Sequence, residues 1–296
     1  MATQKNNFLD PLVLARIAGL KLRAQLVVEG FIAGLHQSSY RGYSLEFAQH
    51  REYVAGDELR HLDWKVYGRT DRFFIKQFEE ETNLRVYLLL DASASMGFKG
   101  QNSALSKYDY GATLLASVAY LTLRQQDSVG LACLREFGQR LIPAQNSSQH
   151  LNVVLDELES VKPQGEGNLG KSLESVAFRA NKRSLFILVS DLFDSQDSLI
   201  NALKFLRFKK HEVMVVHLLD SDEQRFPYTG SVEFESLENQ EKMTLETDSY
   251  RTEYLRAMDE FMKSAKASLQ SSAIQYCFST TQEPIDRLMR RMLIES

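Results

Sequence analysis

Short apolar runs alternate with longer helical patterns over the C-terminal two thirds of the chain. The runs at 185–189 and 213–217 lack the alternation of polar and apolar residues that marks a half-exposed strand. Such runs are typical of parallel strands that are buried on both faces. Strands that alternate with helices of ten or more residues indicate right-handed βαβ crossovers. The pattern therefore predicts an α/β fold with a doubly wound, mostly parallel sheet.

The pattern also fixes the expected elements. The strands expected in one sheet are 84–90, 129–135, 185–189, 213–219 and 274–279, with a further strand-like stretch at 140–143. The expected helices are 108–126, 149–161, 171–181, 198–210, 250–269 and 285–293. One interruption, at 226–248, contains two short alternating stretches around Glu238–Glu241. It predicts a β-hairpin inserted near the edge of the sheet.

The N-terminal part of the chain has a different character. Residues 8–35 have apolar positions near a 3.6-residue period, which predicts a helix. Residues 42–83 mix strand-like stretches, turn residues and many charges. We therefore expect an N-terminal accessory module over 1–83 and a larger domain over 84–296.

Composition narrows the classes of partner and location. Of the 296 residues, 44% are hydrophobic and 25% are charged, and the net charge of −4 gives no basic field for nucleic acid. Met1–Asp10 lacks the pattern of a signal peptide, and the uncharged, largely apolar run Tyr110–Leu123 is shorter than the roughly 18 residues of a membrane span. Cys133 and Cys277 are isolated, as expected of free thiols. These features predict a cytoplasmic protein without a membrane span.

Candidate chemistry begins where the strand at 84–90 ends. Asp91, Ser93 and Ser95 follow at positions i, i+2 and i+4. Open α/β sheets bind ligands at the carboxyl ends of their strands, and hard oxygen donors with few charges suit Mg²⁺. Asp191 ends another apolar strand and is expected at the same edge. The alternative is that Asp91 and Asp191 only cap the helices that follow them.

The order of these residues resembles a known site. Asp91-Ala-Ser93-Ala-Ser95 resembles the DxSxS motif of von Willebrand factor A domains, and Val189-Ser-Asp191 resembles the later aspartate of that site. The resemblance implies a metal-ion-dependent adhesion site in which Asp91, Ser93, Ser95 and Asp191 hold Mg²⁺ and a partner's acidic side chain completes the shell.

One ligand of that site is missing from the sequence. The family's threonine falls in the stretch Gly165–Leu169, where Gly167 takes its place, although Asn168 could supply an amide oxygen. The resemblance therefore implies a degenerate site that binds Mg²⁺ weakly or not at all.

The accessory module carries motifs of its own. RExxxGD at 51–57, RxxDW at 60–64 and KxFExE at 76–81 are similar to the signature of the domain-of-unknown-function 58 family. Together with the downstream domain, the resemblance covers roughly residues 35–296. It implies an adaptor that accompanies a MoxR-type AAA+ ATPase. The charged residues of these motifs would otherwise form an ion-pair network that pins the module to the domain.

A second motif suggests a different class of function. Residues 165–172 fit the P-loop pattern GxxxxGK[ST], which would favour a metal- or nucleotide-dependent enzyme acting on phosphates. A phosphate-binding loop of this type must follow a strand, whereas the preceding segment, 151–161, has helical spacing. We therefore interpret the motif as a loop between helices.

The favoured prediction is a non-enzymatic protein-interaction module. Its loops at 91–97, 165–169 and 191–194 would face the partner. The residues predicted to contact that partner are Met96, Gly97, Glu166 and Asp194.

The vacant threonine position gives a first testable prediction. Because Gly167 offers no hydroxyl, the wild-type chain should bind Mg²⁺ weakly, and Gly167→Thr should bind it more tightly, since Mg²⁺ demands a nearly complete octahedral shell. Isothermal titration of both proteins with Mg²⁺ measures the difference. Tight binding by the wild-type chain, unchanged by the added hydroxyl, would contradict the prediction.

Overall fold

The computed structural model describes residues 11–17, 19–37, 51–52, 74–75, 84–135, 140–165, 169–193, 196–238 and 241–294. The chain divides into two compact units. One comprises residues 1–34 and 84–296, and the other comprises residues 35–83. This division and the prediction of an accessory module over 1–83 both place a boundary after residue 83, and they differ in the grouping of the first 34 residues.

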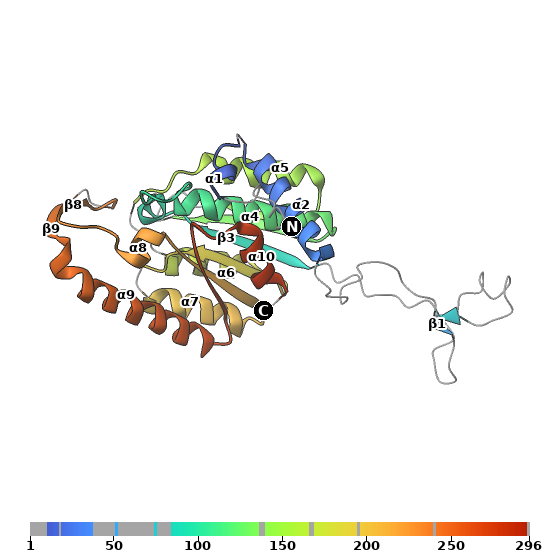
Figure 1. Ribbon diagram of the computed structural model, residues 1–296. Coiled ribbons are helices and arrows are strands. Elements are labelled where there is room, and N and C mark those ends of the chain that lie inside the picture. The colour runs from blue at the N-terminus through green and yellow to red at the C-terminus, as the bar shows by residue number, and fades with distance from the viewer. Residues whose placement is uncertain are drawn as a thin grey trace. The chain divides into compact units, whose positions relative to one another are not determined.

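The large unit is built on a six-stranded sheet with the order β10-β7-β6-β3-β4-β5 (Figure 1). Every neighbouring pair is parallel except β4 and β5, which pair antiparallel at one edge. The strands are β3 (Arg85–Asp91), β4 (Ser128–Leu134), β5 (Leu141–Gln145), β6 (Leu185–Ser190), β7 (Glu212–Leu219) and β10 (Gln275–Thr280). The predicted doubly wound, mostly parallel sheet is confirmed.

Helices cover both faces of the sheet (Figure 1). One face carries α4 (Lys107–Arg124) and α5 (Ser148–Ser160), and α10 (Ile285–Leu293) contacts α4. The other carries α6 (Leu169–Arg179), α7 (Gln196–Phe208) and α9 (Thr247–Gln270). Both faces of β3 and β6 are therefore covered by apolar layers, which explains why polar and apolar residues do not alternate along these strands.

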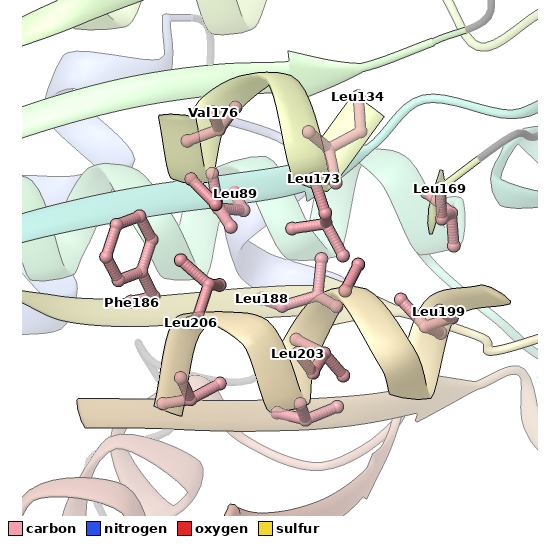
Figure 2. Packing of buried hydrophobic residues seen from close by; sticks show 14 of the residues in the cluster. Leu89, Leu134, Leu169, Leu173, Val176, Phe186, Leu188, Leu199, Leu203 and Leu206 are labelled. Carbon is pink, nitrogen blue, oxygen red and sulfur yellow. The ribbon is translucent and has the colours of Figure 1, made fainter. Parts of the chain in front are cut away.

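The core beneath α6 and α7 shows this packing directly (Figure 2). Leu89 and Leu188 point from adjacent strands toward Leu173 and Leu203 of the two helices, and none of the four is exposed to solvent. Complete burial of a leucine contributes roughly 1.5–3 kcal/mol to folding. The sheet that positions the candidate site is thus rigidly held from this side.

The predicted helix at 8–35 is two helices, α1 (Pro11–Leu14) and α2 (Leu20–Gln37). Gly19, between them, has a φ of 86°, a backbone conformation that side-chain-bearing residues rarely adopt. The second helix is tied to the large unit at its start, where the Leu20 amide donates to Glu159 Oε1 at 2.6 Å.

The smaller unit contributes one described pairing. β1 (Arg51–Glu52) pairs antiparallel with β2 (Phe74–Ile75). Other charged residues of the predicted motifs, Asp57, Arg60 and Asp63, lie outside the described residues.

The interruption at 226–248 is a β-hairpin, as predicted, but it forms a separate two-stranded sheet of β8 (Ser231–Glu235) and β9 (Lys242–Glu246). Two short elements were not expected: the 3₁₀ turn η3 (Ala94–Gly97) and α8 (Ser221–Arg225). Cys133 is buried and Cys277 is half-buried. Within the described ranges, no helix is long and apolar enough to cross a membrane.

His217 of β7 gives a prediction about stability. It is buried beside Phe261, Phe278 and Tyr276, whose hydroxyl lies 2.8 Å from His217 Nδ1. Burial lowers the pKa of His217 from 6.5 to about 4, although the charge of Asp191 opposes the shift. Because the folded pKa lies below the unfolded one, the neutral ring stabilises the fold above pH 6.5, and this contribution is lost as pH falls toward 4.

His217→Gln should therefore make the free energy of unfolding less dependent on pH between pH 7 and pH 4.5. Urea unfolding at pH 7 and pH 4.5 should show the wild-type chain losing about 2–3 kcal/mol more than the variant between the two conditions. Equal losses in both proteins would mean that His217 is protonated without cost in the folded state.

Candidate functional site

Asp91 and Asp191 come to the same edge of the sheet. Asp91 is the last residue of β3, and Asp191 directly follows β6, which pairs with β3 in parallel so that Leu90 lies opposite Val189. Both aspartates are 1% exposed. The carboxyl ends of two adjacent central strands thus deliver two buried carboxylates to one place, as the sequence led us to expect.

The Asp91 carboxylate is satisfied by hydroxyl and amide donors. Its Oδ1 accepts from the Ser93 amide at 2.9 Å and from Ser93 Oγ at 2.7 Å. Its Oδ2 accepts from Ser190 Oγ at 2.6 Å. Ser190 lies next to Asp191 at the end of β6, so this bond fastens the two strand ends to each other.

The two motif serines also meet. Ser93 Oγ lies 3.1 Å from Ser95 Oγ. Ser93 is buried, while Ser95 is half-buried and Gly97 is exposed. The DxSxS segment therefore passes from the floor of the site, at Asp91, to the protein surface within six residues.

Asp191 has a cationic partner that the sequence analysis did not identify. Lys107 Nζ donates to Asp191 Oδ2 at 2.7 Å and to Glu223 Oε1 at 2.6 Å. The Lys107 side chain has no exposed surface. The other carboxylate oxygen, Asp191 Oδ1, accepts from the Phe193 amide at 3.2 Å.

Glu223 reaches this position because of a helix cap. Asp220, directly after β7, caps α8, and the Glu223 side chain returns to accept from the Asp220 amide at 2.7 Å. This capping box fixes the rotamer of Glu223. Glu223 Oε1 is then left facing Lys107.

Aromatic rings close the site around the ammonium. Lys107 Nζ lies 5.1 Å from the centre of the Phe193 ring and 5.9 Å from that of Phe98. Phe193 is itself 43% exposed, so it separates the ammonium from solvent while presenting its other side to the surface. A lysine at the first position of a helix opposes the helix dipole, and this was the available sequence signal for an unusual role of Lys107.

Charge and burial set the protonation of these groups. Burial tends to lower the pKa of Lys107, but Asp191 and Glu223 outweigh it and raise that pKa overall, so the side chain is an ammonium. Burial, and after it the charge of Asp191, raises the pKa of Asp91 from 3.8 to about 7 against the hydrogen bonds from Ser190 and Ser93. Among the residues that the structure describes, no cation is paired with Asp91 as Lys107 is paired with Asp191.

The loop after α5 lies against the DxSxS segment. The Gln164 amide donates to the Ala92 carbonyl at 3.0 Å, and the Ala94 amide donates to the Gly165 carbonyl at 3.0 Å. Glu166, Gly167, Asn168 and Asp194 lie outside the described residues.

The predicted partner contact at Met96 needs correction. The Met96 side chain is completely buried, so a partner cannot reach it. The 3₁₀ turn, which the sequence analysis did not expect, directs this side chain inward and leaves Gly97 exposed.

The P-loop pattern at 165–172 occurs in the wrong context for a phosphate site. It follows α5 and a loop rather than a strand, and Lys171 and Ser172 already lie within α6. A Cβ on Gly170 would clash with Ser198 of α7. Gly170 is thus explained by the close approach of two helices.

The residues present do not fit the metal site that the motif implies. Both oxygens of Asp91 and both oxygens of Asp191 already accept hydrogen bonds, and Asp191 is neutralised by Lys107. A divalent ion on the Asp191 carboxylate would lie within about 5 Å of the ammonium, where the repulsion amounts to several kcal/mol at an effective dielectric constant of about 20. Among the residues that the structure describes, no three His, Cys, Asp or Glu side chains gather around a possible ion.

Two solved structures share a general likeness with this chain. BatB from Bacteroides thetaiotaomicron has a TM-score of 0.44 and 13% identity, over 71% of this chain and 98% of that one. The SpRpn10 VWA domain has a TM-score of 0.44 and 10% identity, over 70% of this chain and 94% of that one. At these scores, nothing about the partners or activity of this chain follows.

Sequence comparison gives the family. An uncharacterized protein of Mycobacterium tuberculosis strain H37Rv is 25% identical over 235 residues, which cover 78% of this chain and 72% of that protein. The uncharacterized protein YeaD of Bacillus subtilis is 27% identical over 119 residues, which cover 40% of this chain and 27% of YeaD. The family model described as protein of unknown function DUF58 matches residues 49–264. Because this match spans well over half of the chain, the chain belongs to the DUF58 family.

Proposed function

We propose that this chain is a non-catalytic, von Willebrand factor A-like interaction module that binds a partner protein at the carboxyl edge of its sheet. The observation that carries the proposal is the joining of three loops into one surface. Ser190 binds Asp91 across two strands, and the loop at 161–165 is hydrogen-bonded to the DxSxS segment. Such cross-linking pre-organises a binding surface and reduces the entropy lost on association.

The chemistry of this surface suits a protein partner. The exposed ring of Phe193 and the half-buried ring of Phe98 both lie near Lys107 Nζ, and Phe98 directly follows the exposed Gly97. A large apolar side chain held among hydrogen-bonded polar groups is the usual composition of an interface hot spot. Phe193 is thus the main anchor in our proposal.

The partner that we propose is a MoxR-type AAA+ ATPase in the cytoplasm. This identification comes from the association that the DUF58 resemblance implies. In the same proposal, Mg²⁺ contributes weakly or not at all, because Gly167 replaces the threonine and Asp191 is held by Lys107.

The polar floor of the site gives the first test of this function. Three hydrogen bonds are donated to the buried Asp91 carboxylate, so Asp91→Asn is a less disruptive change than Asp91→Ala. We expect Asp91→Asn to melt within a few degrees of the wild-type chain and to lose capture of the purified MoxR-type ATPase of the same organism. Its amide must reorganise the bonds to Ser93 and Ser190 that shape the loop.

Two phenylalanines provide a matched pair that locates the surface. Phe193→Ala removes the exposed ring at the carboxyl edge, and the comparable Phe208→Ala removes a ring that is 84% exposed at the C-terminal end of α7. Since α7 runs back along the sheet, Phe208 is near the opposite edge. Capture should fall about tenfold or more for Phe193→Ala and remain unchanged for Phe208→Ala. Full capture by folded Asp91→Asn and Phe193→Ala would contradict the proposed surface.

A further inference from the structure

The most unusual group at the carboxyl edge is the completely buried ammonium of Lys107. We infer that Lys107 is a built-in cation that takes the place of a divalent metal at this site, so that the Asp191 carboxylate is neutralised and positioned without any bound ion. The inference concerns charge and metal binding, and it goes beyond the proposed partner function.

The first step is the set of contacts around the ammonium. Two carboxylates from different strand ends, Asp191 after β6 and Glu223 in α8, both bind Lys107 Nζ, at 2.7 and 2.6 Å. The side chains of these two carboxylates are only 2% and 14% exposed. Ion pairs at these distances are charge-assisted hydrogen bonds, which are about twice as strong as neutral ones.

The second step is that such an ammonium is not buried without cause. Removing a lysine head group from water is strongly unfavourable unless opposite charges and hydrogen bonds replace the lost hydration. The two carboxylates provide that replacement, and Phe98 and Phe193 offer their ring faces to the same nitrogen. The positive charge of Lys107 is therefore a structural element of the site.

The third step concerns the place that a metal ion would need. Asp191 Oδ2 is bound to the ammonium and Asp191 Oδ1 to the Phe193 amide, so an ion on either oxygen would have to share it with an existing donor, and an ion on Oδ2 would lie against the ammonium charge. The oxygens of Asp191 and Glu223 that touch Lys107 are held close together by one nitrogen. If the lysine side chain is removed, these two carboxylates and the vacated space form a pocket suited to a hydrated divalent ion.

Shortening the Lys107 side chain should therefore create a metal-binding site. Mn²⁺ serves as the probe, in isothermal titration and by the loss of its free-ion signal in electron paramagnetic resonance. Lys107→Ala should bind Mn²⁺ at least about tenfold more tightly than the wild-type chain. Lys107→Met fills the space without charge, so it should be destabilised and gain no Mn²⁺ binding.

Thermal melting in chelator and in millimolar Mn²⁺ gives an independent readout. Wild-type melting should be the same in both. Lys107→Ala should melt lower than the wild-type chain in chelator and recover part of the difference in Mn²⁺. Lys263→Met is the matched control, because Lys263 makes an ion pair of 2.6 Å with Asp259 that is largely exposed, and its loss should change neither melting nor Mn²⁺ binding.

A double variant keeps the test informative if Lys107→Ala does not fold. Lys107→Met with Asp191→Asn removes a charge from each side, so it should be more stable than Lys107→Met alone.

The inference is overturned if Mn²⁺ raises the melting temperature of the wild-type chain and Asp91→Asn abolishes that rise. It is equally overturned if Lys107→Met is as stable as Lys263→Met, or if the double variant is no more stable than the single one.

Discussion

The ammonium of Lys107 is the charge on which the arrangement of the carboxyl edge depends. It holds the carboxylate that follows β6 and the carboxylate presented by α8 after β7, and it does so from the first residue of α4. Three elements that are distant in the sequence thus meet at one nitrogen. Without a positive charge between them, Asp191 and Glu223 would repel each other in a space from which water is excluded, which would destabilise the loops that they anchor unless another cation replaced the ammonium.

Asp91 is held by a different kind of interaction. Hydroxyl and amide donors from Ser93 and Ser190 surround it, and no described cation is bonded to it. The neighbouring aspartates are therefore unequal: one is paired with an ammonium, while the pKa of the other is raised to about 7 by burial and by its neighbour's charge. This inequality explains how two buried carboxylates of adjacent strands can coexist. It also means that the DxSxS motif can act here as a hydrogen-bonded support for a binding loop.

The sequence predicted the sheet well because its signals are local. The strands at 84–90 and 185–189 were placed within one residue of β3 and β6, since continuous apolar runs bounded by polar residues mark buried strands. The helix at 8–35 was wrong in one respect, because the break at Gly19 comes from a single left-handed residue that periodicity does not detect. The 3₁₀ turn at Ala94–Gly97 was missed because four residues are too few to show a hydrophobic period, and the inward direction of Met96 was missed with it.

The candidate site was predicted only in part because its charges come from distant segments. Asp91, Ser93 and Ser95 could be grouped by their spacing, and Asp191 by its place after a strand. Nothing in the sequence pairs Lys107 with Asp191 and Glu223, which are 84 and 116 positions away. Only the strand order, with β6 between β3 and β7, brings these three residues together.

The central claim is that Lys107 is a permanently charged, solvent-excluded ammonium bound to two carboxylates. Nitrogen-15 NMR of the lysine ammonium groups tests it most directly, with Lys107→Met identifying the signal. We expect one slowly exchanging ammonium resonance that is lost in the variant and is unchanged by millimolar Mg²⁺. An exchange rate like that of exposed lysines, or displacement of the resonance by Mg²⁺, would contradict the account.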